Sequence, residues 1–401
     1  MSHFCLLFYI IFFSLIINTK IIAQNAEELN KNAMELFKQG KIEEAAAEFK
    51  KAIKLDSTFV NAYINLGYLN YLNGKLDEAI AINRKALIFE PENALAHNNL
   101  AGALLAQGNY NESINEFKLA IQYNPNYPQA YNNMAFAFNS LGLHDLAIKS
   151  AKKAVELKPD YALAYNYLGM ANLAKGIFDE AEVHFKKALE LEPTLVAAHN
   201  NLGITYRAKG QIDESINTHL TALKIDSLNI ETLNDLGLSY FDKGEMKKAI
   251  EAFDKALKIA PNFSKVYNNL AYVYYEIYNY SLAMQYAKTA ERLGIKINPE
   301  FMADLMKALD PNYMRARHIL VKTRSDADQI LNELKNGADF RKLARKKSLD
   351  SATSYKEGDF GYFKKGDLRS EFENIILNLK VGEISGIVKT DMGFHIFQRL
   401  N

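Results

Sequence analysis

The sequence has almost no cysteine, no tryptophan and no excess of charge of either sign, and each absence narrows what the folded chain can do. Cys5 is the only cysteine among 401 residues, and it lies in an apolar N-terminal stretch. The folded part therefore has no disulfide framework, no cysteine zinc site and no thiol nucleophile. The 48 Lys and Arg against 47 Asp and Glu give a formal net charge of +1, which argues against nucleic acid as a partner.

Metal-ligand spacing is also lacking. Five of the eight histidines fall at positions of a helical repeat rather than in ligand clusters: His97, His144, His184, His199 and His219. Zinc and similar sites need histidines or carboxylates at short, defined spacings. We therefore expect no metal and no cofactor.

Long apolar runs are scarce too, apart from one at the N-terminus. Phe4–Ile17 reads FCLLFYIIFFSLII, which is shorter than the ~20 residues of a membrane span and suits the core of a signal peptide. The preceding residues carry little positive charge, and Lys20 follows the run, so an uncleaved anchor stays an alternative. We predict a signal peptide or anchor over residues 1–23. The body is then exported to the periplasm or cell envelope, with membrane association only through this segment.

What is present is a repeat. From residue 26 to 297 the sequence repeats every 34 residues, eight times, without an insertion. Position 27 of the unit is Ala throughout, from Ala52 to Ala290, and position 8 is always Gly or Ala. Small residues at fixed offsets mark places where two helices cross closely. Glycine ends the first helix of seven units, at position 15. The units run 26–59, 60–93, 94–127, 128–161, 162–195, 196–229, 230–263 and 264–297.

This pattern resembles the tetratricopeptide repeat family closely, with the period of that family. The resemblance implies an all-α superhelix of eight helix pairs with a concave groove. Pro299–Leu309 is expected to form a further helix that caps the array, within a 298–312 capping and linker segment.

Asparagine recurs just before the packing seam of the first helix. Position 6 holds Asn65, Asn99, Asn133, Asn201 and Asn269, and position 5 holds Asn98, Asn132, Asn166, Asn200, Asn234 and Asn268. A carboxamide both donates and accepts, which suits the backbone of an extended peptide. The arrangement is similar to the asparagine ladder of O-linked N-acetylglucosamine transferase, whose groove holds peptide backbone. We predict that the position-6 asparagines contact unfolded or extended polypeptide. The alternative is that both sets satisfy polar groups at helix ends or in neighbouring repeats.

From residue 313 the repeat is gone and the pattern becomes mixed. Arg317–Val321, Asp359–Phe363, Gly386–Lys389 and Phe394–Leu400 are expected to be strands, and Ser325–Lys335, Ala338–Lys346 and Leu368–Leu379 helices. These elements predict a small α+β domain over 313–401.

Five segments of this domain look like the parvulin family of peptidyl-prolyl cis-trans isomerases. They are ARHILVKT (316–323), NGADFRKLARKKSLD (336–350), EGDFGYF (357–363), LKVGEISGIVKT (379–390) and MGFHIF (392–397). The resemblance implies catalytic roles for His318, Asp350, Thr390 and His395. It implies an apolar proline pocket of Phe360, Leu368, Phe372 and Met392.

This domain departs from the family pattern at several points. Leu368 stands where Met is usual, Phe360 where Leu is usual, and Glu357 where Gly is usual. The loop Lys322–Arg324 lacks the basic cluster of phosphate-reading members, so we expect no phosphoserine specificity. The histidines could also be a structural pair linking two strands, and Asp350 a helix-end residue.

Two functions follow from these features. The first is an exported isomerase and folding helper, in which the groove binds polypeptide and the C-terminal domain isomerises X-Pro bonds. The second is a non-catalytic envelope scaffold that uses both domains for protein–protein interaction. A groove used for self-assembly is a third, less favoured class. The four site residues and the apolar pocket favour the first.

Overall fold

The computed structural model describes Ile22 and residues 24–401, which form two compact units, one ending at Gln211 and the other running from Ile212 to Asn401. The predicted signal or anchor segment, residues 1–23, lies outside the described residues except for Ile22. Within the described part of the chain, no helix combines the length and apolar character needed to cross a membrane.

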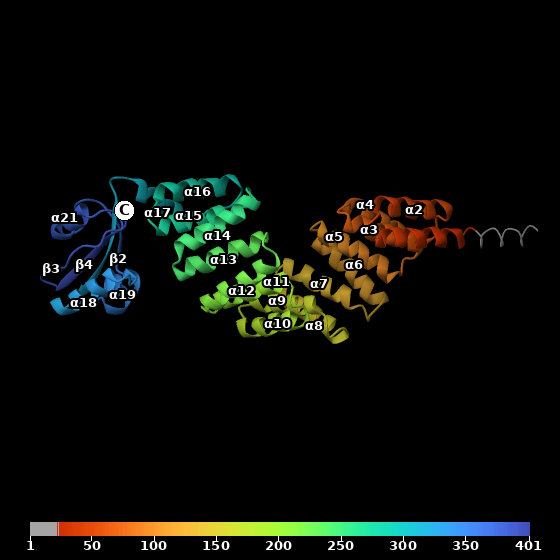
Figure 1. Cartoon of the computed structure of the whole chain (residues 1–401), viewed down its shortest axis with the longest axis horizontal. Helices are drawn as coiled ribbons and strands as arrows, with labels where there is room; N and C mark the ends of the chain where they lie inside the picture. The colour runs from red at the N-terminus through yellow and green to blue at the C-terminus, as the bar shows by residue number, and fades with distance from the viewer. Residues whose placement is uncertain (1–21, 23) are drawn as a thin grey trace, which may run out of the picture. The chain divides into compact units, whose positions relative to one another are not determined.

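The first unit is a stack of antiparallel helix pairs (Figure 1). Residues 24–38 are helical, and Ala33 of this segment packs in one cluster with Ala45 and Phe49 of the next helix. The labelled helices are α2 (Ile42–Leu55), α3 (Val60–Leu72), α4 (Leu76–Phe89), α5 (Ala94–Ala106), α6 (Tyr110–Tyr123), α7 (Pro128–Ser140), α8 (His144–Leu157), α9 (Ala162–Ala174), α10 (Phe178–Leu191) and α11 (Val196–Ala208).

Two glycine positions explain why the unit folds this way. Gly74 follows α3 with φ +72° and its equivalents share this left-handed conformation, which ends each first helix sharply. Gly169, at position 8, lies under Phe185, and an added Cβ would come within 2.5 Å of that ring. A side chain larger than that of Gly or Ala at position 8 would therefore push the two helices of a pair apart.

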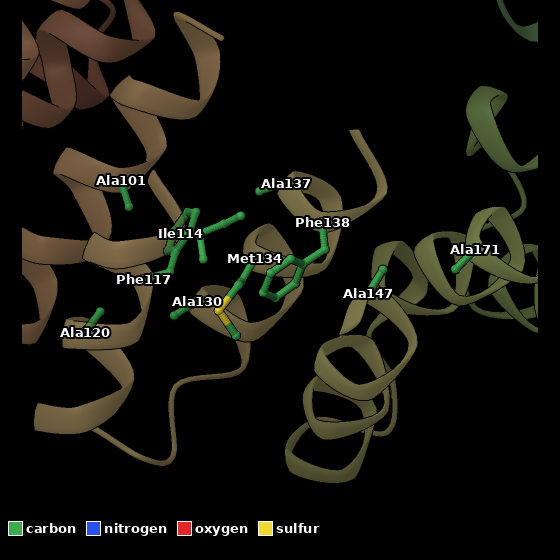
Figure 2. Packing of buried hydrophobic residues seen from close by; sticks show 10 residues of the cluster. All are labelled: Ala101, Ile114, Phe117, Ala120, Ala130, Met134, Ala137, Phe138, Ala147 and Ala171. Atoms are coloured by element: carbon green, nitrogen blue, oxygen red, sulfur yellow. The ribbon is translucent and has the colours of Figure 1, made fainter. Parts of the chain in front are cut away.

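Alanine and large apolar side chains fill the space between pairs. In one cluster, Ile114 and Phe117 of α6 face Met134 and Phe138 of α7 (Figure 2). Phe117 is fully buried. Each pair buries its apolar face against the next one, so the core extends along the stack.

The second unit begins with more helix pairs and ends in a sheet. Its helices in the array are α12 (Ile212–Ile225), α13 (Ile230–Lys243), α14 (Met246–Ile259), α15 (Ser264–Glu276), α16 (Tyr280–Arg292) and α17 (Pro299–Leu309). The side chain of Asn298 caps α17 by accepting from the backbone N–H of Glu300 at 2.8 Å. Phe301 and Leu305 of α17 pack into the cluster that contains Ala271 and Tyr280, so α17 covers the end of the eighth pair.

Residues 314–399 form the sheet and its covering helices. The strands are β1 (Met314–Val321), β2 (Asp359–Phe363), β3 (Val388–Lys389) and β4 (Phe394–Arg399), and the helices are α18 (Arg324–Lys335), α19 (Phe340–Lys347), α20 (Ser351–Ser354) and α21 (Ser370–Asn378). The sheet order is β2-β1-β4-β3, with all pairs antiparallel. Helices α18 and α19 pack on one face, around Ile319 and Ile396, and α21 packs on the other, around Phe372 and Phe397.

The prediction of an all-α array followed by a small α+β domain is confirmed. The capping helix α17 has the predicted bounds, and so does β2. Strand β1 begins three residues earlier than predicted, at Met314, because Met314 and Ala316 alternate with Arg315 and Arg317 as buried and half-buried residues.

Candidate active site

The predicted histidines meet at the centre of the sheet, on the face covered by α21. His318 comes from β1 and His395 from β4, and the two strands are neighbours. Both imidazoles are almost inaccessible, with 2% and 0% of their surface exposed. Strand alternation puts Ala316 and His318 of β1 on the same face, away from Arg317.

The predicted polar residues form one hydrogen-bonded chain. The Nδ1 atoms of His318 and His395 lie 3.1 Å apart. The Nε2 of His318 lies 2.7 Å from Oδ2 of Asp350, and the Nε2 of His395 lies 2.9 Å from Oγ1 of Thr390. The structure thus brings together all four residues that the parvulin resemblance singles out as catalytic.

When both imidazoles are neutral, these four hydrogen-bonded residues allow only one placement of their protons. Asp350 is ionised and accepts, so the N–H of His318 lies on Nε2. The Nδ1 of His318 is then an acceptor, and the Nδ1 of His395 must be the donor. This leaves the Nε2 of His395 as an acceptor for the Thr390 hydroxyl, so every member has one defined role.

The pKa values of the three titrating groups agree with this arrangement. Burial lowers the pKa of His318 and outweighs the neighbouring Asp350, which raises it. Burial, followed by the neighbouring His318, lowers the pKa of His395 to about 4. Burial raises the pKa of Asp350, but hydrogen bonds from Thr353 and His318 outweigh it and leave that pKa below its ordinary value. Near pH 7 the site therefore holds two neutral imidazoles and one carboxylate.

Aromatic rings enclose the histidine pair. The ring of Phe360 lies 4.5 Å from His318, and the ring of Phe372 lies 5.0 Å from His395, between centroids. Leu368 packs in the same cluster. The fourth predicted pocket residue, Met392, stands apart from this cluster with 46% of its surface exposed.

Two residues of the site were missed by the sequence reasoning. Thr353 donates to Oδ2 of Asp350 at 2.6 Å and lies 3.1 Å from Nε2 of His318. Phe397 is fully buried, and its ring lies parallel to that of His395, 5.6 Å away. The alternation of β4 places Phe397 two residues after His395 on the same face, which is a signal that could have identified it.

Asp350 combines the two roles considered for it. It is the N-cap of α20, where its Oδ1 accepts from the backbone N–H of Ala352 at 3.1 Å. Its other oxygen serves His318 and Thr353. The cap holds the carboxylate still, so the same contacts that end the loop also orient the His318 ring.

A strained turn fixes the strand that carries Phe360. Glu357 has φ +63° and Gly358 has φ +82°. A Cβ on Gly358 would lie 2.2 Å from the carbonyl oxygen of His318, and that residue's N–H donates to the Gly358 carbonyl at 2.9 Å. The backbone at Gly358 therefore passes close to that of His318, which brings β2 and Phe360 next to the imidazole.

This arrangement suits rotation about a prolyl amide bond. Such rotation is slow because amide resonance gives a barrier of about 18–20 kcal/mol, and it makes or breaks no covalent bond. A catalyst needs an apolar pocket for the proline ring and a polar floor that favours the twisted amide. Among the described residues, no group of histidine, cysteine and carboxylate side chains could hold a metal ion.

The predicted groove asparagines bond to one another across repeats. Three position-6 side chains donate through Nδ2 to the position-5 oxygen of the preceding repeat: Asn65 to Asn30 at 3.0 Å, Asn201 to Asn166 at 3.0 Å and Asn269 to Asn234 at 2.8 Å. Asn133 instead accepts from Asn132 at 3.1 Å, and Asn99 is half-buried. A link between neighbouring repeats, one of the alternatives above, is thus present.

Comparison with known families places both parts of the chain. Residues 304–401 match the PPIC-type PPIase domain, and eight segments match tetratricopeptide repeats. The latter segments are 34–74, 60–93, 102–142, 128–161, 162–195, 184–217, 205–244 and 237–277. The chain therefore carries a tetratricopeptide array and a C-terminal PPIC-type domain.

Curated relatives match the C-terminal part. A foldase protein PrsA of Geobacillus sp. is 41% identical over 104 residues, which cover 26% of this chain and 37% of the relative. A parvulin-like PPIase of Rickettsia bellii is 46% identical over 90 residues, which cover 22% of this chain and 32% of the relative. The chain thus spans little more than a third of the length of these relatives. The matches support peptidyl-prolyl cis-trans isomerase activity for the C-terminal domain.

Among solved structures, a tetratricopeptide repeat protein from Parabacteroides merdae has a similar fold. It superposes with a TM-score of 0.52 and is 19% identical, and the match covers 61% of this chain and 96% of that one. This likeness concerns the fold of the array alone.

Proposed function

Residues 304–401 belong to the PPIC-type peptidyl-prolyl cis-trans isomerase family, and from this premise we propose that the chain is an exported folding helper that isomerises X-Pro bonds in polypeptides held by its repeat array. The observation that carries the proposal is the hydrogen-bonded chain from Thr390 through His395 and His318 to Asp350, enclosed by aromatic rings. A scaffold that only binds peptides has no need for neutral, oriented imidazoles beside an apolar pocket.

In the proposed mechanism the proline ring lies against Phe360, Phe372 and Leu368, with Met392 at the exposed edge. The imidazole pair forms the floor below the amide, and Asp350 faces the peptide bond. The site favours the twisted amide over both planar forms because it surrounds the rotating group with few hydrogen-bond partners that stabilise resonance. No proton needs to leave the chain of four residues.

The array is proposed to supply the substrate. Its groove presents position-6 carboxamides, and apolar side chains at position 9, such as Tyr68, Met170 and Leu238, lie one helical turn from position 5. Backbone contacts would bind extended chain without regard to its sequence. Export rests on the proposed signal segment, residues 1–23. The likeness to foldases supports the role as a folding helper.

The test measures cis–trans isomerisation of an X-Pro peptide by the full chain and by two variants. Asp350→Ala removes the partner of His318, and we expect kcat/KM to fall about tenfold, which corresponds to about 1.4 kcal/mol in the transition state. Asp328→Ala is the matched control, because Asp328 is exposed on α18 and forms an ion pair with the exposed Arg324, away from the site. No acceleration by the folded wild-type chain would favour the scaffold instead.

A further inference from the structure

The eighth repeat differs from the others at the turn between its two helices. Position 15 is glycine with a positive φ in the seven preceding repeats, and in the eighth it is Tyr278, with φ +63°. Residues with a Cβ rarely adopt this conformation, so it persists where surrounding contacts demand it. Among the described residues, the other non-glycine with positive φ is Glu357, beside β2. Tyr278 and Glu357 line the same small cavity of about 110 Å³, together with Arg317 and Arg341.

The residues around this turn contact the isomerase domain directly. The hydroxyl of Tyr280, itself buried, donates to the carbonyl oxygen of Leu400. Glu276 accepts from Nη1 of Arg341 at 2.8 Å. A Cβ on Gly382 would lie 3.4 Å from the ring of Tyr278, so the two are in close contact. The eighth repeat is therefore packed against the sheet rather than joined to it by a free linker.

One of these contacts reaches the strand that carries the proline pocket. Arg315 of β1 donates through Nη1 to the hydroxyl of Tyr275. Its Nε donates to Oδ2 of Asp359 at 2.9 Å. The hydroxyls of Tyr275 and Tyr362 lie 3.1 Å apart. The guanidinium also lies over the ring of Tyr362, 5.0 Å from its centroid. The hydrogen bonds of one arginine thus join Tyr275 of α15 to Asp359 at the start of β2, and its ring contact reaches Tyr362 of the same strand.

Asp359 and Phe360 are consecutive residues of β2, so their side chains lie on opposite faces of the sheet. Asp359 faces the array, where Arg315 holds it. Phe360 faces the site, where its ring lies 4.5 Å from that of His318. If Arg315 loses its bond to Tyr275, Asp359 can shift. Because Asp359 and Phe360 share a peptide bond, Phe360 then shifts as well.

We propose that Tyr275 is a positioning residue of the isomerase site, and that the eighth repeat thereby helps to shape the proline pocket of the isomerase domain. Tyr275 fixes the Arg315 guanidinium, Arg315 fixes Asp359, and Asp359 sets the depth at which Phe360 enters the pocket. This inference rests on the proposed isomerase function for its kinetic test. It has a structural readout that does not depend on activity.

The experiment uses the full chain with Tyr275→Phe, which removes only the hydroxyl. We expect kcat/KM for an X-Pro peptide to fall roughly fivefold at a temperature well below unfolding, because a displaced pocket wall weakens the fit to the transition state. Phe360→Ala should lower kcat/KM as well, and the double variant should be no slower than Phe360→Ala alone, because both changes act through one ring. Tyr267→Phe is the matched control, since Tyr267 is also on α15 and its hydroxyl donates to the carbonyl of Pro261, which belongs to the array.

The structural readout is the NMR signal of the His318 imidazole and the Phe360 ring. Tyr275→Phe should shift both signals, whereas Tyr267→Phe should leave them in place. Unchanged signals and unchanged kcat/KM in Tyr275→Phe would overturn the inference, and so would additive effects in the double variant. If the wild-type chain has no activity, the proposed function fails, and the NMR comparison alone decides the role of Tyr275.

Discussion

At the scale of single residues, the histidine pair is the part of the site most sensitive to pH. Both imidazoles have pKa values below the ordinary value, because burial disfavours the charged form. In the unfolded chain each would titrate near pH 6.5. Between that pH and the folded-state pKa, the unfolded state binds more protons than the folded state, so acid favours unfolding there.

This gives a prediction for stability. As pH falls from about 6.5 to about 4, the isomerase domain should lose stability, by up to about 3 kcal/mol from His395 alone, whose pKa is lowered to about 4. Asp350 adds a loss only below its unfolded pKa, near 3.9. Hydrogen exchange of the β1 and β4 amides at several pH values measures this dependence. His395→Phe should flatten the curve over this range, and an equal slope in that variant would contradict the assignment.

The residues of the site differ in how well the sequence predicts them. His318, His395, Asp350 and Thr390 could be predicted because they resemble a family pattern, and the structure joins them in one network. Thr353 could not, since its role depends on the turn at Asp350 that brings it back to His318. The sequence Asp350-x-x-Thr353 at a helix start is the only local sign of it.

At the scale of elements, the fold of the array can be predicted from its 34-residue period, because each helix pair repeats the same local contacts. Gly74 and its equivalents end helices by local backbone geometry, and position 8 is small for local packing. The contact between the eighth repeat and the sheet could not be predicted in this way. It joins Tyr275 to Arg315 and Tyr280 to Leu400, pairs far apart in the chain with no shared periodicity.

The turn before β2 allows a sharp prediction about one glycine. Gly358→Ala should destabilise the isomerase domain by about 3 kcal/mol or more, because the new Cβ meets the carbonyl of His318 at 2.2 Å as well as requiring φ +82°. Equilibrium unfolding by denaturant measures the loss. Gly361→Ala is the matched control: Gly361 also has a positive φ, of +75°, but open space around its missing Cβ. It should cost only about 1 kcal/mol, and equal losses in the two variants would show that the close approach is unimportant.

At the scale of the whole molecule, the proposed function joins capture and catalysis in one chain. A polypeptide bound by the array would have an effective concentration at the isomerase site set by the span between them, without any new contact at the site. The proposal therefore implies that loss of groove binding slows the isomerisation of long unfolded clients more than that of short peptides. Short peptides reach the site directly and gain little from the array.

The bonds between repeats make it possible to separate a groove role from a packing role of the asparagines. The variant Asn133→Ala, Asn201→Ala, Asn269→Ala removes three position-6 carboxamides. The variant Asn132→Ala, Asn166→Ala, Asn234→Ala breaks the same bonds from the position-5 side and leaves position 6 intact. If position 6 contacts client backbone, only the first variant should lose affinity for an unfolded polypeptide, by about tenfold or more from several lost hydrogen bonds.

Fluorescence anisotropy of a labelled, permanently unfolded client measures this affinity, and circular dichroism checks that both variants remain helical. Proline-limited refolding of a long client should slow in the first variant, while isomerisation of a short X-Pro peptide should not change, because residues 314–399 are untouched. Equal losses of affinity in the two variants would mean that the ladder acts by holding neighbouring repeats together. Unchanged affinity in the position-6 variant would remove the groove asparagines from client binding altogether.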